Sequence, residues 1–171
     1  MDGIDIRYIA GFFDGEGSIG IYYRKKNKDR FHLRTQLTQN KSDYVEYLMN
    51  YLMKIYGGNL GEQITLSGHI KYNWQLNADK AVHFLREILP HLILKKAQAD
   101  IAIKWQTQRP KVSRDKKGRI CSKCKDTVDY DIKIAKIIEL LKIFDINEVM
   151  SNQNDLVKVL VELHPLAVVK G

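Results

Sequence analysis

Two pairs of short segments with alternating polar and apolar residues restrict this chain to folds that contain an antiparallel sheet. The first pair covers 18–26 and 29–39, and the second covers 59–66 and 70–76. Short polar runs at 26–29 and 67–69 connect the members of each pair. A period of two is typical of strands with one buried face, and short connections join antiparallel neighbours. Each pair is therefore predicted to form a β-hairpin with one apolar and one polar face.

Helical periodicity separates and follows the two hairpins. Apolar residues spaced three and four apart predict helices over 5–14, 43–56, about 79–88 and about 95–107. Ser42 is a suitable N-cap for the second helix, and Pro90 ends the third. This order of elements predicts an α+β fold, with helices on one face of an antiparallel sheet and the polar strand faces left open.

The composition is that of a folded, basic protein. Of the 171 residues, 44% are apolar and 28% are charged, and 28 Lys and Arg against 20 Asp and Glu give a net charge of +8. This apolar content supports a packed core and excludes disorder as the main state. The excess of positive charge favours a polyanionic partner, most often nucleic acid.

The sequence also indicates the cellular compartment in which the protein is expected. No stretch approaches the ~20 uncharged apolar residues that a membrane span needs, so no membrane partner is expected. The N-terminus lacks the basic region and apolar core of a secretory signal, and the chain has only two cysteines. We therefore expect an intracellular protein of the cytoplasm, nucleoid or an organelle matrix, not a secreted one.

The C-terminal part differs from the rest. Between 109 and 125 there are eight basic residues and one acid, which predicts a basic loop lying along a phosphate backbone, with Lys116 and Lys117 among its contacts. Two more amphipathic helices are predicted over about 130–144 and 152–163. The expected organisation is a core domain over 1–108, a basic loop over 109–129 and a C-terminal helical extension over 130–171.

The basic loop contains both cysteines. Cys121 and Cys124 have the spacing of a metal knuckle, but a structural zinc ion needs four ligands and no second pair is present. A disulfide or two unused thiols is favoured over zinc.

The glycines that follow the first predicted helix match a known fingerprint in the wrong context. Residues 15–20 fit G-x-G-x-x-G, which binds dinucleotides when it follows a strand and opens a helix. Here the glycines follow a helix and open a strand, so no dinucleotide site is expected.

Two acids stand at the end of this first helix. Asp14 and Glu16 lie where the helix dipole is negative and carboxylates are disfavoured. A divalent cation would compensate, since it binds carboxylates and backbone carbonyls. The alternative is that Asp14 caps another element and Glu16 is solvated. The small residues Ala10, Gly11 and Gly15 would let a second helix approach closely, or they simply tolerate a helix terminus.

These residues carry a resemblance to a known family. The run Tyr8-Ile9-Ala10-Gly11-Phe12-Phe13-Asp14-Gly15-Glu16-Gly17-Ser18-Ile19 resembles the signature of the LAGLIDADG homing endonucleases. The order of predicted elements over 5–107 agrees with that family, whereas 109–171 lies outside the match. The resemblance implies an αββαββα fold whose antiparallel sheet forms a saddle, followed by the C-terminal helices.

The resemblance also implies a catalytic site. Glu16 takes the place of the metal-binding acid, with the Gly15 carbonyl as a second ligand, and Asp14 matches an acid that caps the partner helix. Gln39 would order water, and Lys95 would stabilise charge near the phosphate, with Lys96 as the alternative if the register differs by one. The implied ion is Mg²⁺ or Mn²⁺, with Ca²⁺ as a non-catalytic substitute.

A single signature supplies half of such a site and so implies a homodimer. The helices would pack together through Ile9, Ala10, Gly11, Phe13 and Asp14. The implied activity is metal-dependent, site-specific cleavage of double-stranded DNA at a long, roughly palindromic target, leaving 3′ overhangs. An RNA-binding splicing cofactor (a maturase) and a non-catalytic DNA-binding protein on the same fold are the alternatives.

The polar strand faces would then read the DNA, because a two-stranded ribbon fits the major groove and Arg, Asn and Gln pair with base edges. The residues expected to contact DNA on the two hairpins are Tyr22, Arg24, Lys26, Arg30, His32, Arg34, Gln36, Thr38, Gln63, Thr65, Lys71, Asn73 and Gln75.

Overall fold

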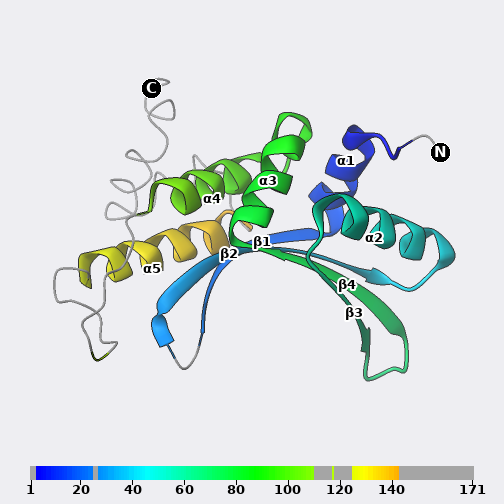
Figure 1. Ribbon diagram of the computed structural model, residues 1–171, viewed down its shortest axis with the longest axis horizontal. Helices are drawn as coiled ribbons and strands as arrows, with labels where there is room; N and C mark the ends of the chain where they lie inside the picture. Colours follow the sequence, from blue (N-terminus) through cyan, green and yellow to red (C-terminus); the bar gives the residue numbers. More distant parts are fainter. Residues whose placement is uncertain (1–2, 25–26, 110–116, 118–124, 143–171) are drawn as a thin grey trace.

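The computed structural model describes residues 3–24, 27–109, 117 and 125–142 (Figure 1). The elements follow one another along the chain as α1 (Ile6–Glu16), β1 (Gly17–Arg24), β2 (Asn27–Asn40), α2 (Asp43–Tyr56), β3 (Asn59–Ile64), β4 (Ile70–Asn77), α3 (Ala78–Ile88), the short 3₁₀ helix η1 (Leu89–His91), α4 (Lys96–Gln108) and α5 (Lys125–Leu140). No helix in these ranges is long and apolar enough to cross a membrane.

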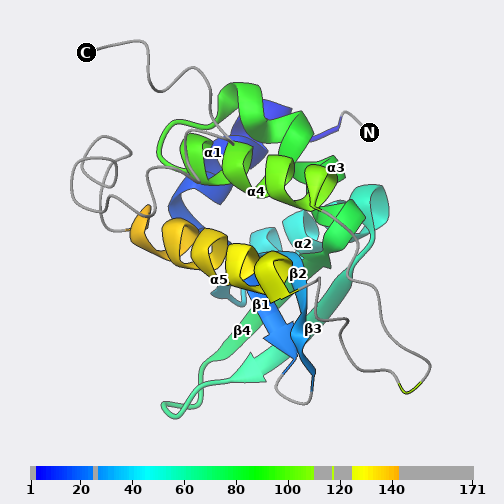
Figure 2. The same ribbon diagram turned by 90° about the vertical axis from the view of Figure 1, so that its left-hand side faces the viewer.

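A single four-stranded antiparallel sheet organises the molecule, in the order β1-β2-β4-β3. The second hairpin therefore joins the first through β4, and β3 lies at an edge. Leu37 of β2 lies opposite both Gly17 of β1 and Trp74 of β4. In both ribbon views all helices lie on one side of the curved sheet, and its other face is open (Figures 1 and 2). The predicted α+β architecture and element order are confirmed.

The core forms between the inner strand face and the helices. The alternating apolar positions of the strands, such as Ile19, Leu33 and Leu37, are almost completely buried. Phe84 of α3 packs edge-on against Phe13 of α1, with ring centroids 5.2 Å apart, and the same distance separates it from Trp74. Every second strand residue is thus buried, because each strand has one face against the helices and one face open.

Several boundaries differ from the sequence predictions, among them the start of β2 at Asn27, where a turn was predicted. The first helix continues through Gly15 to Glu16, because the N–H of Gly17 donates to the carbonyl of Phe13 and completes its last turn. Helix α5 begins at Lys125, earlier than expected. The helix expected over 152–163 lies outside the described residues.

A buried charged cluster fixes α5 to the rest of the core. The carboxylate of Asp131 accepts hydrogen bonds from Nε of Arg109 at 2.9 Å and from Nε1 of Trp105 at 2.8 Å. Nη1 of Arg109 donates to the carbonyl of Phe31 at 3.0 Å. Burial raises the pKa of Asp131, although both hydrogen bonds favour its ionised form. The cluster therefore joins α4, α5 and β2 through one ion pair.

Replacing Asp131 by Ala is expected to lower the free energy of unfolding by about 3–5 kcal/mol, because Arg109 is left largely buried without an anion. The measurement is denaturant unfolding. The control is Asp129→Ala on the same helix, where the ion pair with Lys133 is exposed and little change is expected. Equal effects of the two substitutions would contradict the proposed importance of the buried pair.

Candidate functional site

The site predicted from the signature lies where α1 runs directly into β1. Glu16 is the last residue of α1 and its side chain is exposed. Gly17 follows without a loop, and only glycine fits there, because a Cβ at this position would lie 2.5 Å from the carbonyl oxygen of Phe13. The close approach of strand to helix therefore holds the Glu16 carboxylate at the end of the helix.

Asp14, two residues earlier, points the other way. Its carboxylate is buried and accepts hydrogen bonds from the backbone N–H groups of Ile93 at 2.6 Å, Leu94 at 3.1 Å and Lys95 at 2.9 Å. These N–H groups belong to the turn that leads into α4 and to Lys95, its N-cap residue. Asp14 therefore caps another element of its own chain, which decides between the two readings of this acid.

Lys95 returns a hydrogen bond to α1. Its Nζ donates to the main-chain carbonyl of Asp14, in the last turn of that helix. Burial lowers the pKa of Lys95, although the charges of Asp14 and Glu16 oppose this change. Lys96 is exposed at the start of α4, and no described contact joins it to α1. Of the two candidate lysines, Lys95 is thus the one held beside the end of α1.

Gln39 lies at the same end of the sheet. It stands two residues beyond Leu37, which pairs with Gly17, and opposite Tyr72 of β4. Its Oε1 accepts a hydrogen bond of 2.8 Å from the backbone N–H of Asn40. No described hydrogen bond joins Gln39 to Glu16 or Lys95.

Among the described residues, Glu16 is the one exposed carboxylate at this end of α1. No group of three or more His, Cys, Asp or Glu side chains that could hold a metal ion occurs in the described part of the chain. The Glu16 carboxylate has no hydrogen-bond or ion-pair partner among those residues, and it lies at the negative end of a helix. An exposed, unpartnered carboxylate suits a divalent cation, so Glu16 fits one ligand of a metal site.

The face of α1 expected to contact a second chain is largely used within the molecule. Ile9, Ala10 and Phe13 are at most 4% exposed, and Asp14 is buried as described above. The expectation that these four residues form a dimer interface is corrected: their helical spacing reflects packing on the chain's own core. Of the five expected residues, only Gly11 is exposed.

The outward face of α1 has a different composition. Tyr8, Gly11 and Gly15 are exposed, and Phe12 is half-buried and lies 6.2 Å from the Tyr8 ring. A Cβ added at Gly11 or Gly15 would meet nothing within 4 Å. The backbone of α1 is therefore open on this side.

The open sheet face gathers most of the residues expected to contact DNA. The register places Gln36 beside Gln75 and Thr38 beside Asn73. The other predicted residues on this face are Tyr22, His32, Arg34, Gln63 and Lys71. Sequence reasoning missed Ser18, Asn59 and Asn77, which share the face through the same pairings.

Several predicted contacts lie elsewhere or outside the described part of the chain. Thr65 follows β3 in the hairpin turn, where its Oγ1 accepts from the N–H of His69. The backbones of Arg24 and Arg30 belong to β1 and β2, but their side chains are outside the described residues. Both the backbone and the side chain lie outside the described residues for Lys26, Lys116, Cys121 and Cys124. Lys117 is exposed in a turn.

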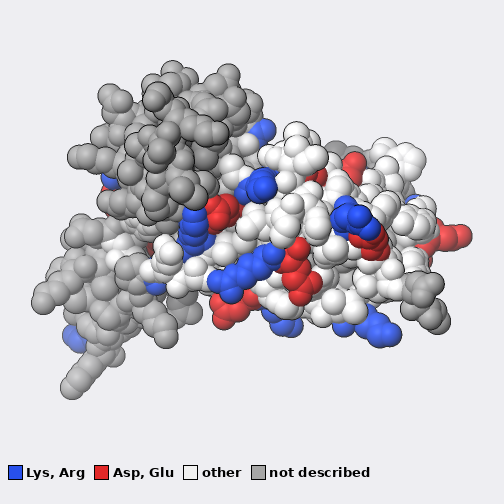
Figure 3. Space-filling model, turned by 90° about the horizontal axis from the view of Figure 1, so that it is seen from above, with Lys and Arg blue, Asp and Glu red and all other residues white. Residues whose placement is uncertain are grey.

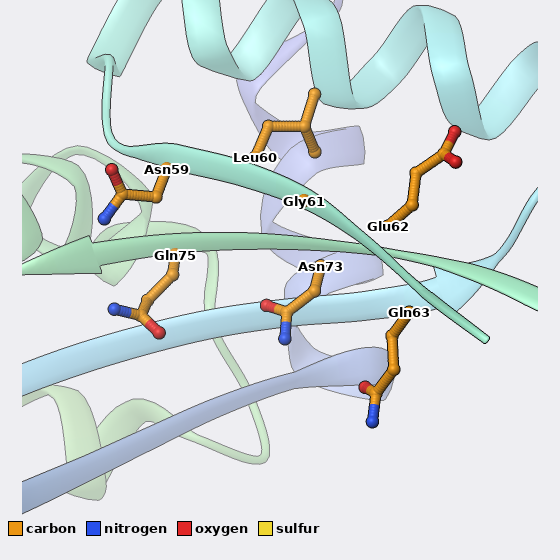
Figure 4. A pocket seen from close by; sticks show the side chains of 7 residues that line it. All are labelled: Asn59, Leu60, Gly61, Glu62, Gln63, Asn73 and Gln75. Carbon is orange, nitrogen blue, oxygen red and sulfur yellow. The ribbon is translucent and has the colours of Figure 1, made fainter. Parts of the chain in front are cut away.

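A shallow pocket of about 370 Å³ lies at the β3–β4 edge and is lined by Asn59, Leu60, Gly61, Glu62, Gln63, Asn73 and Gln75. Figure 4 shows the four amide side chains on one side of the strands, with Leu60 and Glu62 on the other. The amides thus project from the open face, where they can donate and accept hydrogen bonds.

The two sides of the molecule differ in charge. Seen over the helices, Lys and Arg are interspersed with Asp and Glu (Figure 3). On the open sheet face, the described side chains include Arg34 and Lys71 but neither Asp nor Glu. The positive charge of the open face is therefore not balanced within the described strands, which suits an anionic ligand.

Comparisons with known proteins identify the family of the chain. The model of the family described as "LAGLIDADG endonuclease" matches residues 9–107. The DNA endonuclease I-CreI of Chlamydomonas reinhardtii is 33% identical over 122 residues, which are 67% of this chain and 71% of that protein. The chain belongs to the LAGLIDADG endonuclease family, as its signature predicted.

Solved structures show the same fold. The homing endonuclease I-CvuI, in complex with its target in the presence of Ca, superposes with a TM-score of 0.59 at 17% identity, covering 92% of this chain and 93% of that one. The homing endonuclease I-TnaI gives a TM-score of 0.52 at 16% identity, covering 95% and 99%. The predicted homing-endonuclease fold is confirmed.

Replacing Asp14 by Ala is expected to cost about 1–3 kcal/mol of stability, because three N–H groups lose the buried carboxylate that accepts their hydrogen bonds. Denaturant unfolding measures the loss. The control is Asp5→Ala, which removes the exposed cap of α1, where Asp5 accepts from the N–H of Arg7 at 2.8 Å. Water can replace that exposed bond, so a smaller loss is expected; a larger loss for Asp5 would contradict the account.

Proposed function

We propose that this chain is a metal-dependent, site-specific DNA endonuclease that acts as a homodimer. The observation that carries the proposal is the position of Glu16: an exposed, unpartnered carboxylate beside Lys95, at the end of a sheet whose open face carries no described acid. Two structures of I-CvuI, one in complex with its target and one with uncleaved DNA of the I-CreI target, support DNA as the partner.

The metal would be held by the Glu16 carboxylate and the Gly15 carbonyl. Mg²⁺ or Mn²⁺ fits these oxygen ligands, and Ca²⁺ would bind without supporting cleavage. When bound, such an ion acidifies water and neutralises charge that develops on the phosphate. The metal would also remove the unfavourable placement of a carboxylate at a helix C-terminus.

Lys95 and Gln39 would act from the protein side. The bond from Lys95 to the carbonyl of Asp14 fixes its ammonium group before DNA binds, so that its charge is preorganised near a scissile phosphate. Gln39, at the adjacent end of β2, offers an amide that can orient a water molecule. Asp14 would act only by holding α4, and thus Lys95, against α1.

Two copies are needed because one chain offers one such carboxylate, whereas a double-strand break requires hydrolysis on both strands. The outward face of α1 would form the contact, since Gly11 and Gly15 leave its backbone open to a second helix. Two-fold symmetry would place the two Glu16 side chains together and extend the open sheet faces over a long, roughly palindromic duplex. Cleavage in this arrangement would leave 3′ overhangs.

The experiment for catalysis uses duplexes selected by the protein from a randomised pool, incubated with Mg²⁺. Glu16→Gln is expected to bind the selected duplex but to cut it at least about 100-fold more slowly, because the neutral amide is a poor metal ligand. Gel analysis of the products measures both strands. The control Glu139→Gln changes an exposed acid of α5 and should cut normally. Equal cutting by Glu16→Gln, or none by the wild type, would refute the mechanism.

The experiment for the dimer uses Gly11→Leu. The larger side chain has free space within one chain and improves helix propensity by up to about 1 kcal/mol, so each copy should fold, but two α1 helices could no longer approach. Light scattering at micromolar concentration should give a dimer for the wild type and one chain, 19.9 kDa, for the variant. Gly61→Leu, on the open sheet face with equally free space, should stay dimeric. A monomeric wild type would exclude this arrangement.

A further inference from the structure

One arginine on the open sheet face is held in place by residues from two other strands. Arg34 of β2 lies between Gly20 of β1 and Asn77 of β4, its direct partners in the sheet. Tyr22 stands two residues further along β1, on the same face as Gly20. Together these four residues form the Arg34 cluster, which Asn77 joins because β4 lies next to β2.

Two contacts restrain the Arg34 guanidinium. Its central carbon lies 4.6 Å from the centroid of the Tyr22 ring, and its Nε donates to Oδ1 of Asn77 at 3.4 Å. Gly20 makes room for the ring, because a Cβ at that position would lie 2.6 Å from Cε2 of Tyr22. Oδ1 of Asn77 also accepts from Nε2 of Gln75 at 3.3 Å, which orients the amide.

The restraints leave one edge of the guanidinium free. One face of the guanidinium lies over the Tyr22 ring, and Nε is bonded to Asn77. No acceptor for the two terminal amino groups of Arg34 is found among the described residues. The side chain forms no ion pair in that part of the chain, and the open face carries no described acid. The cluster therefore presents two N–H donors in a fixed plane, with their charge unneutralised.

We propose that Arg34 reads a guanine in each half of the DNA target, with Tyr22 and Asn77 as the residues that position it. Guanine offers O6 and N7 side by side in the major groove, and the planar arginine fork is the common partner of this pair. A cation restrained from two sides loses little side-chain entropy on binding, so directional pairing with a base edge is favoured over a mobile phosphate contact. This inference rests on the proposed function, because it presupposes that the open sheet face binds duplex DNA.

The experiment compares base preferences of full-length variants. Duplexes bound by the wild type and by Arg34→Gln are selected from the same randomised pool and sequenced. We expect one symmetry-related pair of positions to change from guanine to adenine, since glutamine pairs with the N6 and N7 groups of adenine, while other positions stay unchanged. In the wild-type duplex, 7-deazaguanine at that position, which lacks N7, should weaken binding about 10-fold.

Variants of the supporting residues separate positioning from folding. Asn77→Ala and Tyr22→Leu should reduce the guanine preference about 5- to 10-fold without changing the unfolding midpoint, and Tyr22→Phe, which keeps the ring face, should retain it. Variants that weaken all duplexes alike and lower the unfolding midpoint would show a structural role and contradict the positioning assignment.

Two other results would overturn the inference, and they can be told apart. If Arg34→Gln leaves every base preference unchanged but lowers the salt dependence of binding by about one ion, Arg34 contacts a phosphate and the endonuclease proposal stands. If the wild type enriches no sequence from the pool, site-specific recognition fails, and the proposed function fails with it.

Discussion

The functional site depends on a reciprocal pair of contacts between α1 and the start of α4. The carboxylate of Asp14 accepts hydrogen bonds from three N–H groups in the turn that leads into α4, and Lys95 returns a hydrogen bond to the Asp14 carbonyl. The end of α1 and the segment before α4 thus satisfy backbone groups of each other. Because Glu16 is two residues beyond Asp14, the same contacts place its backbone near the Lys95 side chain.

The open face of the sheet extends from the end of α1, where Glu16 and Lys95 lie. Gly17 lets β1 leave α1 without a loop, so the open strand faces begin directly beside Glu16. The helices cover the other face and carry charges of both signs (Figures 1 and 3). The described open face carries Arg34 and Lys71 but neither Asp nor Glu. The proposed catalytic and recognition residues would therefore act on one duplex.

Patterns that extend over a few residues of the sequence predicted the helices and the strand faces, but not the contacts between distant segments. The bounds of α2 and the inward and outward strand positions follow from helical spacing, Ser42 and period two, all of which are visible along a few residues. The partner of Asp14 is about 80 residues away in the sequence, so no local signal identifies it. The resemblance implies a dimer interface at Ile9, Ala10 and Phe13, and the sequence alone does not correct it, because an apolar helix face has the same spacing whether it packs on a partner or on its own sheet. The Arg34 cluster requires the strand order, which brings Asn77 beside β2.

The central claim is that two Glu16 side chains hold the catalytic metal over one duplex. The most direct measurement is anomalous scattering from Mn²⁺ in crystals of the protein with its selected duplex. The account predicts metal density within about 2.0–2.6 Å of the Glu16 carboxylates of two copies, on either side of a two-fold axis. A metal held away from Glu16, or a single copy of the chain on the cleaved duplex, would contradict it.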